Sequence, residues 1–599
     1  MSSSETRGAS ESHGKRAPTE RAQRTCPMNV LDSRRLTGPG LLLDCPGAIL
    51  DVRLGDSDPD EVIAAWRQAA HQLLREIGWA NEELAVRRFP GGLSLALTAP
   101  VDALYAATEL NERAWEAAAA QLGERGPTDY TSDVVSIREA ISSERNTALV
   151  ELRRAAAARG LTFLAGEEQV SLGSGTGAQV WPESSLPEPG AVDWSRVHDI
   201  PIALVTGSNG KTTVVRLLAA ILRAAGRNPG LTSTDGVTVG SASIAEGDFS
   251  GPSGARMVLR HPEVQTAVLE IARGGLLRRG LAVERADVAV ITNVADDHLG
   301  EFGIESLAEL ADTKLLVAKA LGGSGTLVLN ADDPMLVERS ARIKAPITWF
   351  SFEPGSPAIT AHVRAGGTAV LVDRGEIVLT CDGESAPVVA LAEVPITFRG
   401  TARHNVANVL AAVGVAAALG VELEQVGAAL RQFGQNPIDN PGRANLIELG
   451  GIGILLDYAH NPHGMSALVA LAQKLPAKRR LVMIGQAGDR SDEAIRQLAR
   501  AVGALRPDYV VVKEMDEYLR GRAPGEVPAL LEEEFLRLGV PRRAVSRVGP
   551  DLAGVRKALE WALPGDLLVL AVHQDRPAVL QLLNGLTEEH WKAGEPLPE

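Results

Sequence analysis

The amino-acid sequence predicts an α/β fold, in which two domains of alternating strands and helices follow an α+β N-terminal domain. The first indication is a series of short runs rich in valine and isoleucine, which begins at Ile200 and alternates with helical segments. Such runs are typical of parallel strands that are buried on both faces. The second indication is the stretch TGSNGKTT (206–213), which has the glycines, lysine and threonines of a phosphate-binding loop between a strand and a helix.

Length, charge and cysteine content limit the classes of protein to consider. The chain has 599 residues and a formal charge of −15, and its length corresponds to roughly three or four domains. An acidic chain is a poor candidate for general nucleic-acid binding, which needs basic stripes. No run reaches the roughly 18 apolar residues of a membrane span, and the N-terminus lacks the apolar core of a secretory signal. We therefore expect a cytoplasmic protein without nucleic-acid or membrane partners.

The N-terminal part predicts disorder first and an α+β domain afterwards. Residues 1–27 are rich in serine, arginine and glutamate, and we expect them to be disordered. The domain is expected over residues 28–172, with short strands that precede an amphipathic helix capped by Asp58 and opened by Pro59. Further helices are expected in VDALYAATELNERAWEAAAAQLG (101–123) and after Thr131 or Ser132. Three scattered cysteines predict neither a disulfide framework nor a zinc site: Cys26, Cys45 and Cys381.

Composition divides the remainder into a linker and two domains. Residues 173–197 begin with a stretch rich in glycine, proline and serine, which predicts a linker. A central domain is expected over 198–438, with a β-rich insert over 340–398, and a C-terminal domain over 439–599. The central strands are expected in IPIALV (200–205), TAVLEI (266–271), ADVAVITNV (286–294) and GTLVLNA (325–331). The C-terminal strands are expected in GILLDYAHN (453–461), RLVMIG (480–485), YVVVKE (509–514) and DLLVLAV (566–572).

Each residue type in the phosphate-binding loop has an expected role. Gly207 and Gly210 allow backbone N–H groups to approach phosphate oxygens at the positive end of the helix that follows. Lys211 would place a charge at the β- and γ-phosphates, and the hydroxyl of Thr212 would bind Mg²⁺. The spacing between the glycines is shorter than in the usual motif. We expect the whole loop to bind nucleotide, with Ser208, Asn209 and Thr213 as its other members.

Polar residues follow the other predicted strands of the central domain. Ligands collect at the carboxyl ends of parallel strands, so these residues are candidates for a shared site. Glu270 can complete a Mg²⁺ shell with Thr212. Taken singly, each residue also has an ordinary interpretation as a solvated or salt-bridged side chain. The other candidates are Asn293, Asp297, His298, Lys314, Asn330, Asp332 and Asp333.

Together these stretches resemble the Mur ligase superfamily over residues 198 to 599. The resemblance rests on TGSNGKTT, NVADDHLG (293–300), Lys314 sixteen residues beyond the histidine, LNADDP (329–334) and RHNVANVLAA (403–412). Four further stretches resemble cyanophycin synthetases: YTSDVVSIREAI (130–141), LTSTDGVTVG (231–240), GPSGARMVLRHPEVQTAVLEIARGGLLRRGL (251–281) and KEMDEYLRGRAPGEV (513–527). Those proteins have an ATP-grasp domain where this chain has only the predicted linker, so the resemblance implies a relative with one ligase centre of two.

The resemblance implies a Mur-ligase-type P-loop central domain, a Rossmann-like C-terminal domain and an ATP-dependent carboxylate–amine ligase. Such an enzyme uses ATP and Mg²⁺ and forms an acyl phosphate, which an amine then attacks. The resemblance implies that Lys211, Thr212 and Glu270 handle the phosphates and the first Mg²⁺. It also implies that His298 holds a second Mg²⁺ beside a carbamylated Lys314. The implied nucleotide contacts elsewhere are Asn293, Asn408, Arg443 and Asp457.

The substrates are less well specified than the reaction. The resemblance implies a small-molecule or peptide carboxylate and an amino acid or other amine. Arginine matches carboxylates bidentately, which makes Arg256, Arg273 and Arg278 candidates, although surface arginines are an equally good interpretation. His460 is a further substrate candidate, and DNPGR (439–443) is assigned to a hinge at the domain entry.

Two alternatives to an independent ligase remain open on the sequence. One is a nucleotide-gated binding or scaffold protein that keeps the ligase fold. The other is a Mur-type subunit that serves a separate amidotransferase. The intact set of Lys211, Glu270, His298 and Lys314 favours an active ligase. The sequence leaves open both the role of the N-terminal domain and whether the chain forms a homo-oligomer.

Overall fold

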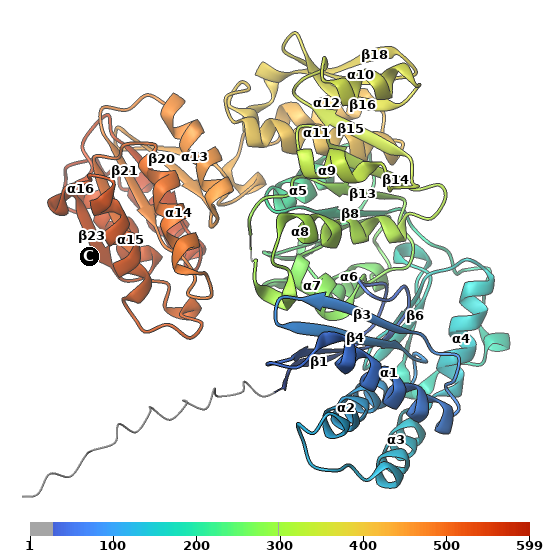
Figure 1. The fold of residues 1–599 in the computed structure, drawn as a ribbon. Coiled ribbons are helices and arrows are strands. Elements are labelled where there is room, and N and C mark those ends of the chain that lie inside the picture. Colours follow the sequence, from blue (N-terminus) through green and yellow to red (C-terminus); the bar gives the residue numbers. More distant parts are fainter. Residues whose placement is uncertain (1–27, 298, 599) are drawn as a thin grey trace, which may run out of the picture.

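The computed structural model describes residues 28–297 and 299–598. The expected disorder of residues 1–27, Cys26 and the proposed role of His298 therefore lie outside the described residues. The described chain forms an N-terminal α+β domain, a central α/β domain with a large sheet, and a C-terminal α/β domain (Figure 1). The predicted fold class is confirmed. No described helix is long and apolar enough to cross a membrane.

The N-terminal domain has one sheet that is covered by helices on one face. The sheet is antiparallel with the order β1-β2-β4-β3, formed by β1 (Asn29–Leu36), β2 (Gly47–Arg53), β3 (Leu84–Phe89) and β4 (Gly92–Thr98). The helices of its core are α1 (Pro59–Glu76), α2 (Leu104–Gln121) and α3 (Tyr130–Glu144), and the helix that follows, α4 (Thr147–Ala158), packs in a separate small core. Trp66 and Trp115 are buried in the core between the sheet and the helices. The predicted start of α1 is confirmed, because the Asp58 side chain accepts from the N–H groups of residues 60 and 61.

The helix that was expected after Thr131 or Ser132 is two helices in the structure. The cap of α3 is Asp129, whose side chain accepts from the backbone N–H groups of residues 131 and 132. Arg145 then leaves the helical conformation, and the Asn146 side chain caps α4 by accepting from Leu149 N. The predicted start was wrong because an aspartate two residues upstream offers a better N-cap than the threonine or serine.

The segment that was predicted to be a linker is packed structure. Strands β5 (Phe163–Ala165), β6 (Gln169–Leu172) and β7 (Gln179–Pro182) form a small antiparallel sheet. Gly175 packs so closely that a Cβ atom there would lie 2.3 Å from Val264 O. Farther along, Val192 and Trp194 pack into a small core with Leu152 of α4. The glycines of this stretch therefore serve close packing, which composition alone does not distinguish from flexibility.

The central domain is built on an eleven-stranded sheet with the order β11-β10-β9-β12-β8-β13-β14-β15-β16-β17-β18. The strands from β9 to β16 in this order are parallel, and antiparallel strands close both edges. The four strands predicted for this domain are confirmed as β8 (Ile202–Thr206), β12 (Thr266–Glu270), β13 (Val288–Ile291) and β14 (Thr326–Asn330). The others are β9 (Pro229–Ser233), β10 (Gly236–Val239), β11 (Ala242–Glu246), β15 (Ile347–Ser351), β16 (Thr368–Asp373), β17 (Glu376–Cys381) and β18 (Glu384–Ala390).

Helices cover both faces of this sheet. One face packs against α5 (Lys211–Ala224), α11 (Arg403–Ala418) and α12 (Leu423–Gln432). The other face packs against α6 (Pro252–Arg260), α7 (Arg273–Arg279), α8 (Leu307–Lys314), α9 (Pro334–Ser340) and α10 (Pro357–Arg364). Residues 340–398 were expected to be an insert, but β15 and β16 continue the parallel sheet beside β14. That prediction was wrong because β-rich composition does not specify which strand a segment pairs with.

The C-terminal domain is a six-stranded sheet with the order β19-β20-β24-β21-β22-β23, parallel except for β19. The predicted strands are confirmed as β20 (Ile452–Asp457), β21 (Arg480–Ile484), β22 (Tyr509–Lys513) and β24 (Leu567–Ala571). The edge strands β19 (Asn445–Leu449) and β23 (Val545–Val548) were missed, since both carry polar, partly exposed residues. The helices are α13 (Pro462–Lys474), α14 (Asp492–Gly503), α15 (Glu526–Arg537), α16 (Asp551–Trp561) and α17 (Arg576–Glu588).

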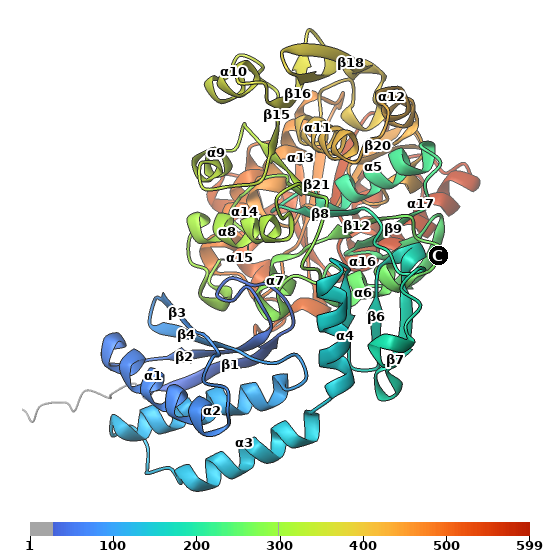
Figure 2. The same cartoon turned by 90° about the vertical axis from the view of Figure 1, so that its right-hand side faces the viewer.

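The three domains meet at the central domain. Figure 1 shows the C-terminal domain, orange to red, beside the central domain and the N-terminal domain, blue, beneath it, and Figure 2 shows the N-terminal sheet from the side. Arg576 at the start of α17 pairs with Asp235 of the central domain at 2.6 Å. Arg34 of β1 donates to Leu277 O of α7 at 3.0 Å. Polar contacts therefore fix both neighbours against the central domain.

Candidate functional site

A cavity of about 400 Å³ lies between the central and C-terminal domains. Its walls come from the phosphate-binding loop, from the ends of central strands and from the loop after β20. Most of the residues predicted from the sequence to bind nucleotide line it: Ser208, Asn209, Gly210, Lys211, Thr212, Thr213, Asn293, Asn408, Arg443 and Asp457. Glu270 and His460 line it as well. The structure thus brings together residues that are more than two hundred positions apart in the chain.

Two glycines give the loop its shape. Gly210 caps α5 with a φ of 90°, and a Cβ atom there would lie 2.1 Å from the Asn408 side-chain oxygen. Gly207 has a φ of 145°, and its Cβ atom would lie 1.9 Å from Thr292 Oγ1. A side chain at either position would therefore displace its neighbour, Asn408 or Thr292. The loop ends at Lys211, where the N-terminus of α5 opens toward the cavity.

The cavity lining at the loop includes two charged residues, Lys211 and Glu270, and the hydroxyl group of Thr212. The Lys211 ammonium group donates to Gly207 O at 3.1 Å and to Ser208 O at 3.4 Å, so it folds over the loop. Thr212 Oγ1 donates to Glu270 Oε2 at 2.9 Å. Glu270 is 1% exposed, and its other oxygen has no hydrogen-bond partner among the described residues. Burial raises the pKa of Glu270, while the nearby Lys211 charge opposes that shift.

The polar residues after β13 and β14 hold the loop from behind. Asn293 Oδ1 accepts from Asn209 N at 3.0 Å, and Asn293 Nδ2 donates to Asn209 O at 3.0 Å. Asn330 Nδ2 donates to Thr292 O at 3.0 Å, and Asp333 accepts from Val294 N at 2.6 Å. Asn330 and Asp333 therefore hold residues 292–294, and Asn293 of this segment holds the loop.

Another part of the cavity lining includes a flat aromatic surface. The guanidinium group of Arg403 stacks over the Phe352 ring at 4.3 Å from its centroid. Asp332 positions this strand end by accepting from Ser351 Oγ at 2.6 Å and from Phe352 N at 2.9 Å. His404 stands beside them, and burial lowers its pKa to about 4, so its imidazole is neutral at physiological pH.

Arg443 and Asp457 organise the C-terminal side of the cavity. Arg443 stacks over the Tyr458 ring at 4.1 Å and donates to Thr234 Oγ1 of the central domain at 3.4 Å. Asp457 accepts from the backbone N–H groups of Ala444 and Ala459, both at 2.7 Å. Burial raises the pKa of Asp457, and Arg443 opposes that shift. The Asp457 carboxylate therefore ties the domain entry to the loop after β20.

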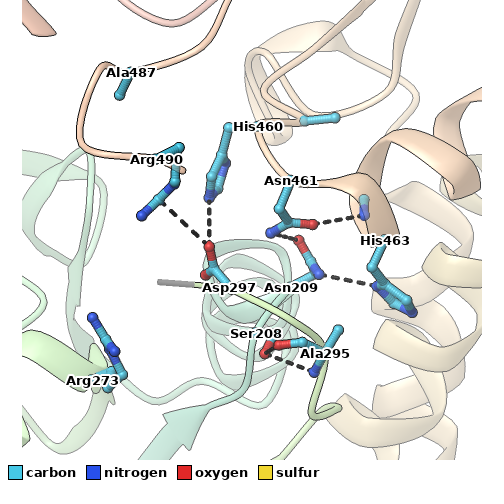
Figure 3. Close-up of polar contacts among 12 residues, drawn as sticks. Ser208, Asn209, Arg273, Ala295, Asp297, His460, Asn461, His463, Ala487 and Arg490 are labelled. Atoms are coloured by element: carbon cyan, nitrogen blue, oxygen red, sulfur yellow. Dashed lines mark hydrogen bonds and ion pairs between the residues drawn. The ribbon is translucent and has the colours of Figure 1, made fainter. Parts of the chain in front are cut away.

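Asn209 links the phosphate-binding loop to the C-terminal domain (Figure 3). Its Oδ1 accepts from Asn461 Nδ2 at 3.0 Å, and its Nδ2 contacts His463 Nδ1 at 3.0 Å. Since an amide nitrogen only donates, His463 Nδ1 is the acceptor and the imidazole is neutral in this contact. Asn461 also caps α13 by accepting from Gly464 N at 2.8 Å. The side chain of Asn209 is therefore committed to the contact between the two domains.

Lys314 is buried at the end of α8, with 3% of its surface exposed. Burial, with the nearby charge of Lys211 and against the opposing charge of Asp297, lowers the pKa of Lys314 to about 7. A substantial fraction of this amine is therefore neutral near pH 7, which is unusual for lysine. Lys314 does not line the cavity, although the charge of Lys211 acts on its amine.

A second set of charged residues surrounds the segment that carries Asp297 (Figure 3). Arg490 of the C-terminal domain approaches Asp297 at 3.6 Å and Glu301 at 3.8 Å. Arg273 at the start of α7 pairs with Glu301 at 2.5 Å, and His460 Nε2 lies 4.0 Å from Asp297. The central and C-terminal domains therefore both reach the described residues on either side of position 298.

The three predicted substrate arginines do not line the cavity. Arg273 belongs to the charged set around Asp297 and Glu301. Arg278 lies over the Phe302 ring at 5.5 Å, and Arg256 donates to Thr37 Oγ1 of the N-terminal domain at 3.3 Å. Burial and the charges of Arg35 and Arg279 lower the pKa of Arg256. Only Arg273 is therefore placed beside other predicted site residues.

Sequence reasoning missed several residues of the site. Arg490, Asn461 and His463 lie four to six residues after the ends of β21 and β20, so a search of the segments that follow the strands of the second sheet would have found them. Phe352 follows the end of β15, a strand that was not predicted, and its stacking with Arg403 joins that strand end to the start of a distant helix. Among the described residues, no group of three or more His, Cys, Asp and Glu side chains could hold a metal ion.

Family models match parts of the central and C-terminal domains. Residues 205–416 match the family model of the Mur ligase middle domain, and residues 442–571 match that of the Mur ligase, glutamate ligase domain. A UDP-N-acetylmuramyl-tripeptide synthetase from Leifsonia xyli subsp. xyli is 30% identical over 376 residues, which are 61% of this chain and 69% of that protein.

Cyanophycin synthetases are more similar in sequence but much longer. The protein from Trichormus variabilis is 36% identical over 398 residues, which are 66% of this chain and 44% of that protein. The protein from Geminocystis herdmanii is 40% identical over 372 residues, which are 62% of this chain and 42% of that protein. The chain therefore matches less than half the length of these relatives.

Proposed function

The chain belongs to the Mur ligase family, and on this premise we propose that it is an ATP-dependent ligase that joins a carboxylate to an amine. In the proposed reaction the γ-phosphate is transferred to the carboxylate, and the amine displaces phosphate from the resulting acyl phosphate. The observation that carries the proposal is the group of Lys211, Thr212 and Glu270 at the phosphate-binding loop, in a cavity that both domains close.

The residues at the loop fit Mg²⁺. Glu270 is a buried carboxylate with one oxygen on Thr212 and one without a hydrogen-bond partner among the described residues. Mg²⁺ is usually held by one or two carboxylates together with substrate phosphates and water, so two protein ligands are sufficient. When bound, the cation neutralises phosphate charge and so permits a second anion to approach. Lys211 adds the fixed positive charge, and the N-terminus of α5 supplies oriented N–H groups.

Lys314 and His298 are the proposed residues on the substrate side. Carbamylation would turn Lys314 into an anion, and its burial favours the neutral amine that this reaction requires. The proposed second metal site also uses His298, which lies outside the described residues. Among the three predicted arginines, Arg273 is favoured for the acidic substrate, because it lies with Asp297 in the charged set near Lys314.

The proposed nucleotide contacts assign the phosphates and the base of ATP to different residues of the cavity lining. The phosphates would lie on residues 207–213, with Asn293 behind the loop. The base would lie near Asn408, where Phe352 and Arg403 offer a flat surface for stacking. Arg443 and Asp457 would act from the C-terminal side, and His460 would lie toward the substrate.

Asn209 yields a prediction about closure of the two domains. The Asn209→Ala variant loses two hydrogen bonds to the C-terminal domain, each worth about 1 kcal/mol. We expect kcat/KM for ATP to fall about tenfold or more. In a double-mutant cycle, His463→Ala should add little to Asn209→Ala, since both break the same contact. Asn228→Ala, which removes a side-chain hydrogen bond to Glu263 O within the central domain outside the cavity, is the control. Fully additive losses would contradict this assignment.

The reaction is tested by phosphate release against a matrix of acids and amines. Acidic metabolites and acidic peptides are crossed with amino acids, including arginine and lysine, in the presence of ATP and Mg²⁺. We expect release that requires both partners, with a product mass equal to their condensation and one phosphate per bond. We expect this dependence because the proposed Mg²⁺ ions beside the γ-phosphate would permit a second anion to approach.

A different outcome would favour the scaffold alternative. If the protein binds ATP but releases phosphate independently of every acid and amine, the ligase proposal fails. The nucleotide-gated binding protein then becomes the better explanation of the same cavity. Release that needs an added amidotransferase would instead favour a subunit role.

A further inference from the structure

The N-terminal domain is docked firmly on the central domain. Thr37 N donates to Arg279 O at 2.9 Å, and Leu281 N donates to Pro39 O at 2.7 Å. A Cβ atom at Gly38 would lie 2.1 Å from Leu281 O, so the two backbones are in direct contact. This part of the N-terminal domain therefore has a fixed position relative to the central domain.

Arg87 of β3 reaches from this domain to the turn that follows Asp297. Its guanidinium group donates to Phe302 O at 2.5 Å and to Gly303 O at 2.8 Å. Phe302 has a φ of 52°, a left-handed conformation that a residue with a Cβ atom keeps only when its surroundings hold it. Gly303 is packed closely against the N-terminal domain, since a Cβ atom there would lie 2.6 Å from the Phe89 ring. Arg87 thus binds both carbonyls of a strained turn.

The same guanidinium group extends its contact to the helix that carries Lys314. Arg87 lies 3.7 Å from Glu309, which is the third residue of α8. Glu309 accepts from the backbone N–H groups of Glu305 and Ser306 at 2.9 and 3.1 Å, and so completes the capping box of α8. Arg87 therefore contacts both the turn after Asp297 and the start of the helix whose last residue is Lys314.

The turn at residues 301–303, which Arg87 contacts, lies among the charged residues of the site. Glu301, one residue before Phe302, pairs with Arg273 and lies near Arg490 of the C-terminal domain. The ring of Phe302 lies between Arg278 at 5.5 Å and Arg34 of the N-terminal domain at 5.4 Å. A shift of this turn would therefore move Glu301 and, through it, the charged set around Asp297.

We infer that the N-terminal domain is a positioning element of the ligase centre, and that Arg87 is the residue through which it holds the turn at 301–303 and the start of α8. Arg87 lines no part of the nucleotide cavity, so it acts on the reaction only through the residues that it positions. The inference rests on the proposed ligase function for its kinetic consequence, but the contact itself can be tested without activity.

The test compares Arg87→Ala with Arg88→Ala in the full chain. Arg88 is the neighbouring arginine of β3, is 55% exposed and pairs with Asp60 within its own domain. We expect Arg87→Ala to lower kcat about tenfold or more, because small displacements of positioned groups are costly. Its affinity for ATP should stay at the wild-type value, and Arg88→Ala should match the wild type in both respects. Hydrogen exchange of backbone amides over residues 299–310 should be faster in Arg87→Ala alone.

Two further measurements separate positioning from general damage. Arg87→Lys should recover only part of kcat, since a single ammonium group does not span two carbonyls as the guanidinium fork does. If Arg87→Ala does not fold, Arg87→Lys carries the same comparison. Unchanged hydrogen exchange, faster exchange with unchanged kcat, or an equal loss of ATP affinity would each overturn the inference. If the wild type forms no amide with any pair, the ligase proposal fails, while exchange still decides whether Arg87 holds the turn.

Discussion

Lys211→Ala is expected to lower both ATP turnover and product formation by about a thousandfold or more, which corresponds to about 4 kcal/mol of lost transition-state stabilisation. The ammonium group of Lys211 lies over the loop, at 3.1 and 3.4 Å from two of its carbonyl oxygens. It is thus held where the β- and γ-phosphates would lie. Without it, charge that develops during phosphoryl transfer has one fixed cation fewer. Phosphate release and product mass measure the two effects.

A surface lysine of the same domain provides the control for Lys211. Lys344 is exposed in the turn before β15, and Lys344→Ala should behave as the wild type. Thermal unfolding should be similar for the two variants, because Lys211 contributes no buried apolar contact to the core clusters. Normal turnover in Lys211→Ala would place the reaction at another site.

Lys314→Ala is expected to be nearly inactive, and added formate or acetate should restore part of the activity. The side chain is 3% exposed, so its removal leaves a buried space that a small carboxylate can enter and where it can replace the carbamate oxygens. The same carboxylates should not restore Lys211→Ala, because that variant lacks a cation. Full activity of Lys314→Ala without any added carboxylate would remove the carbamate from the mechanism.

The pH dependence of the wild type provides a second measurement on Lys314. Only the neutral amine reacts with carbon dioxide, and the pKa of Lys314 is lowered to about 7. The neutral fraction therefore rises with pH, and the wild-type rate should rise between about pH 6 and pH 8, with a response to added bicarbonate in that range. Lys314→Ala restored by formate should lack the bicarbonate response. A bicarbonate response that persists there would place the reacting amine at another residue.

The sequence by itself determined the phosphate-binding loop and the strands that lead to it. The spacing of Gly207, Gly210 and Lys211 is local, and so is the apolar run of each strand, which is why these elements were predicted close to their observed bounds. The convergence of Glu270 and Asn293 on the loop could also be predicted, because parallel strands place their carboxyl ends at one edge. The cap of α1 followed from Asp58 and Pro59 alone.

Pairing between distant segments was decided only by the tertiary structure. Residues 340–398 read as a separate β-rich insert, yet β15 finds its partner in β14 of the main sheet. The glycines at 173–177 read as flexible, yet Gly175 packs against the backbone of Val264. A strand pattern specifies that a partner is needed, and a glycine specifies that close approach is allowed, but neither specifies the partner.

The same limit applies to the contacts between domains. Asn209 was predicted to bind nucleotide because it belongs to the loop, whereas its side chain contacts His463, which is 254 residues away. Arg87 had no signal in the sequence, since its carbonyl acceptor at Phe302 is 215 residues away and carbonyl groups are the same for every residue type. Local chemistry depends on residue types and short spacings, so the sequence determined which groups the site contains. Which side chains hold those groups in place depends on how whole domains meet, and that was decided by the fold.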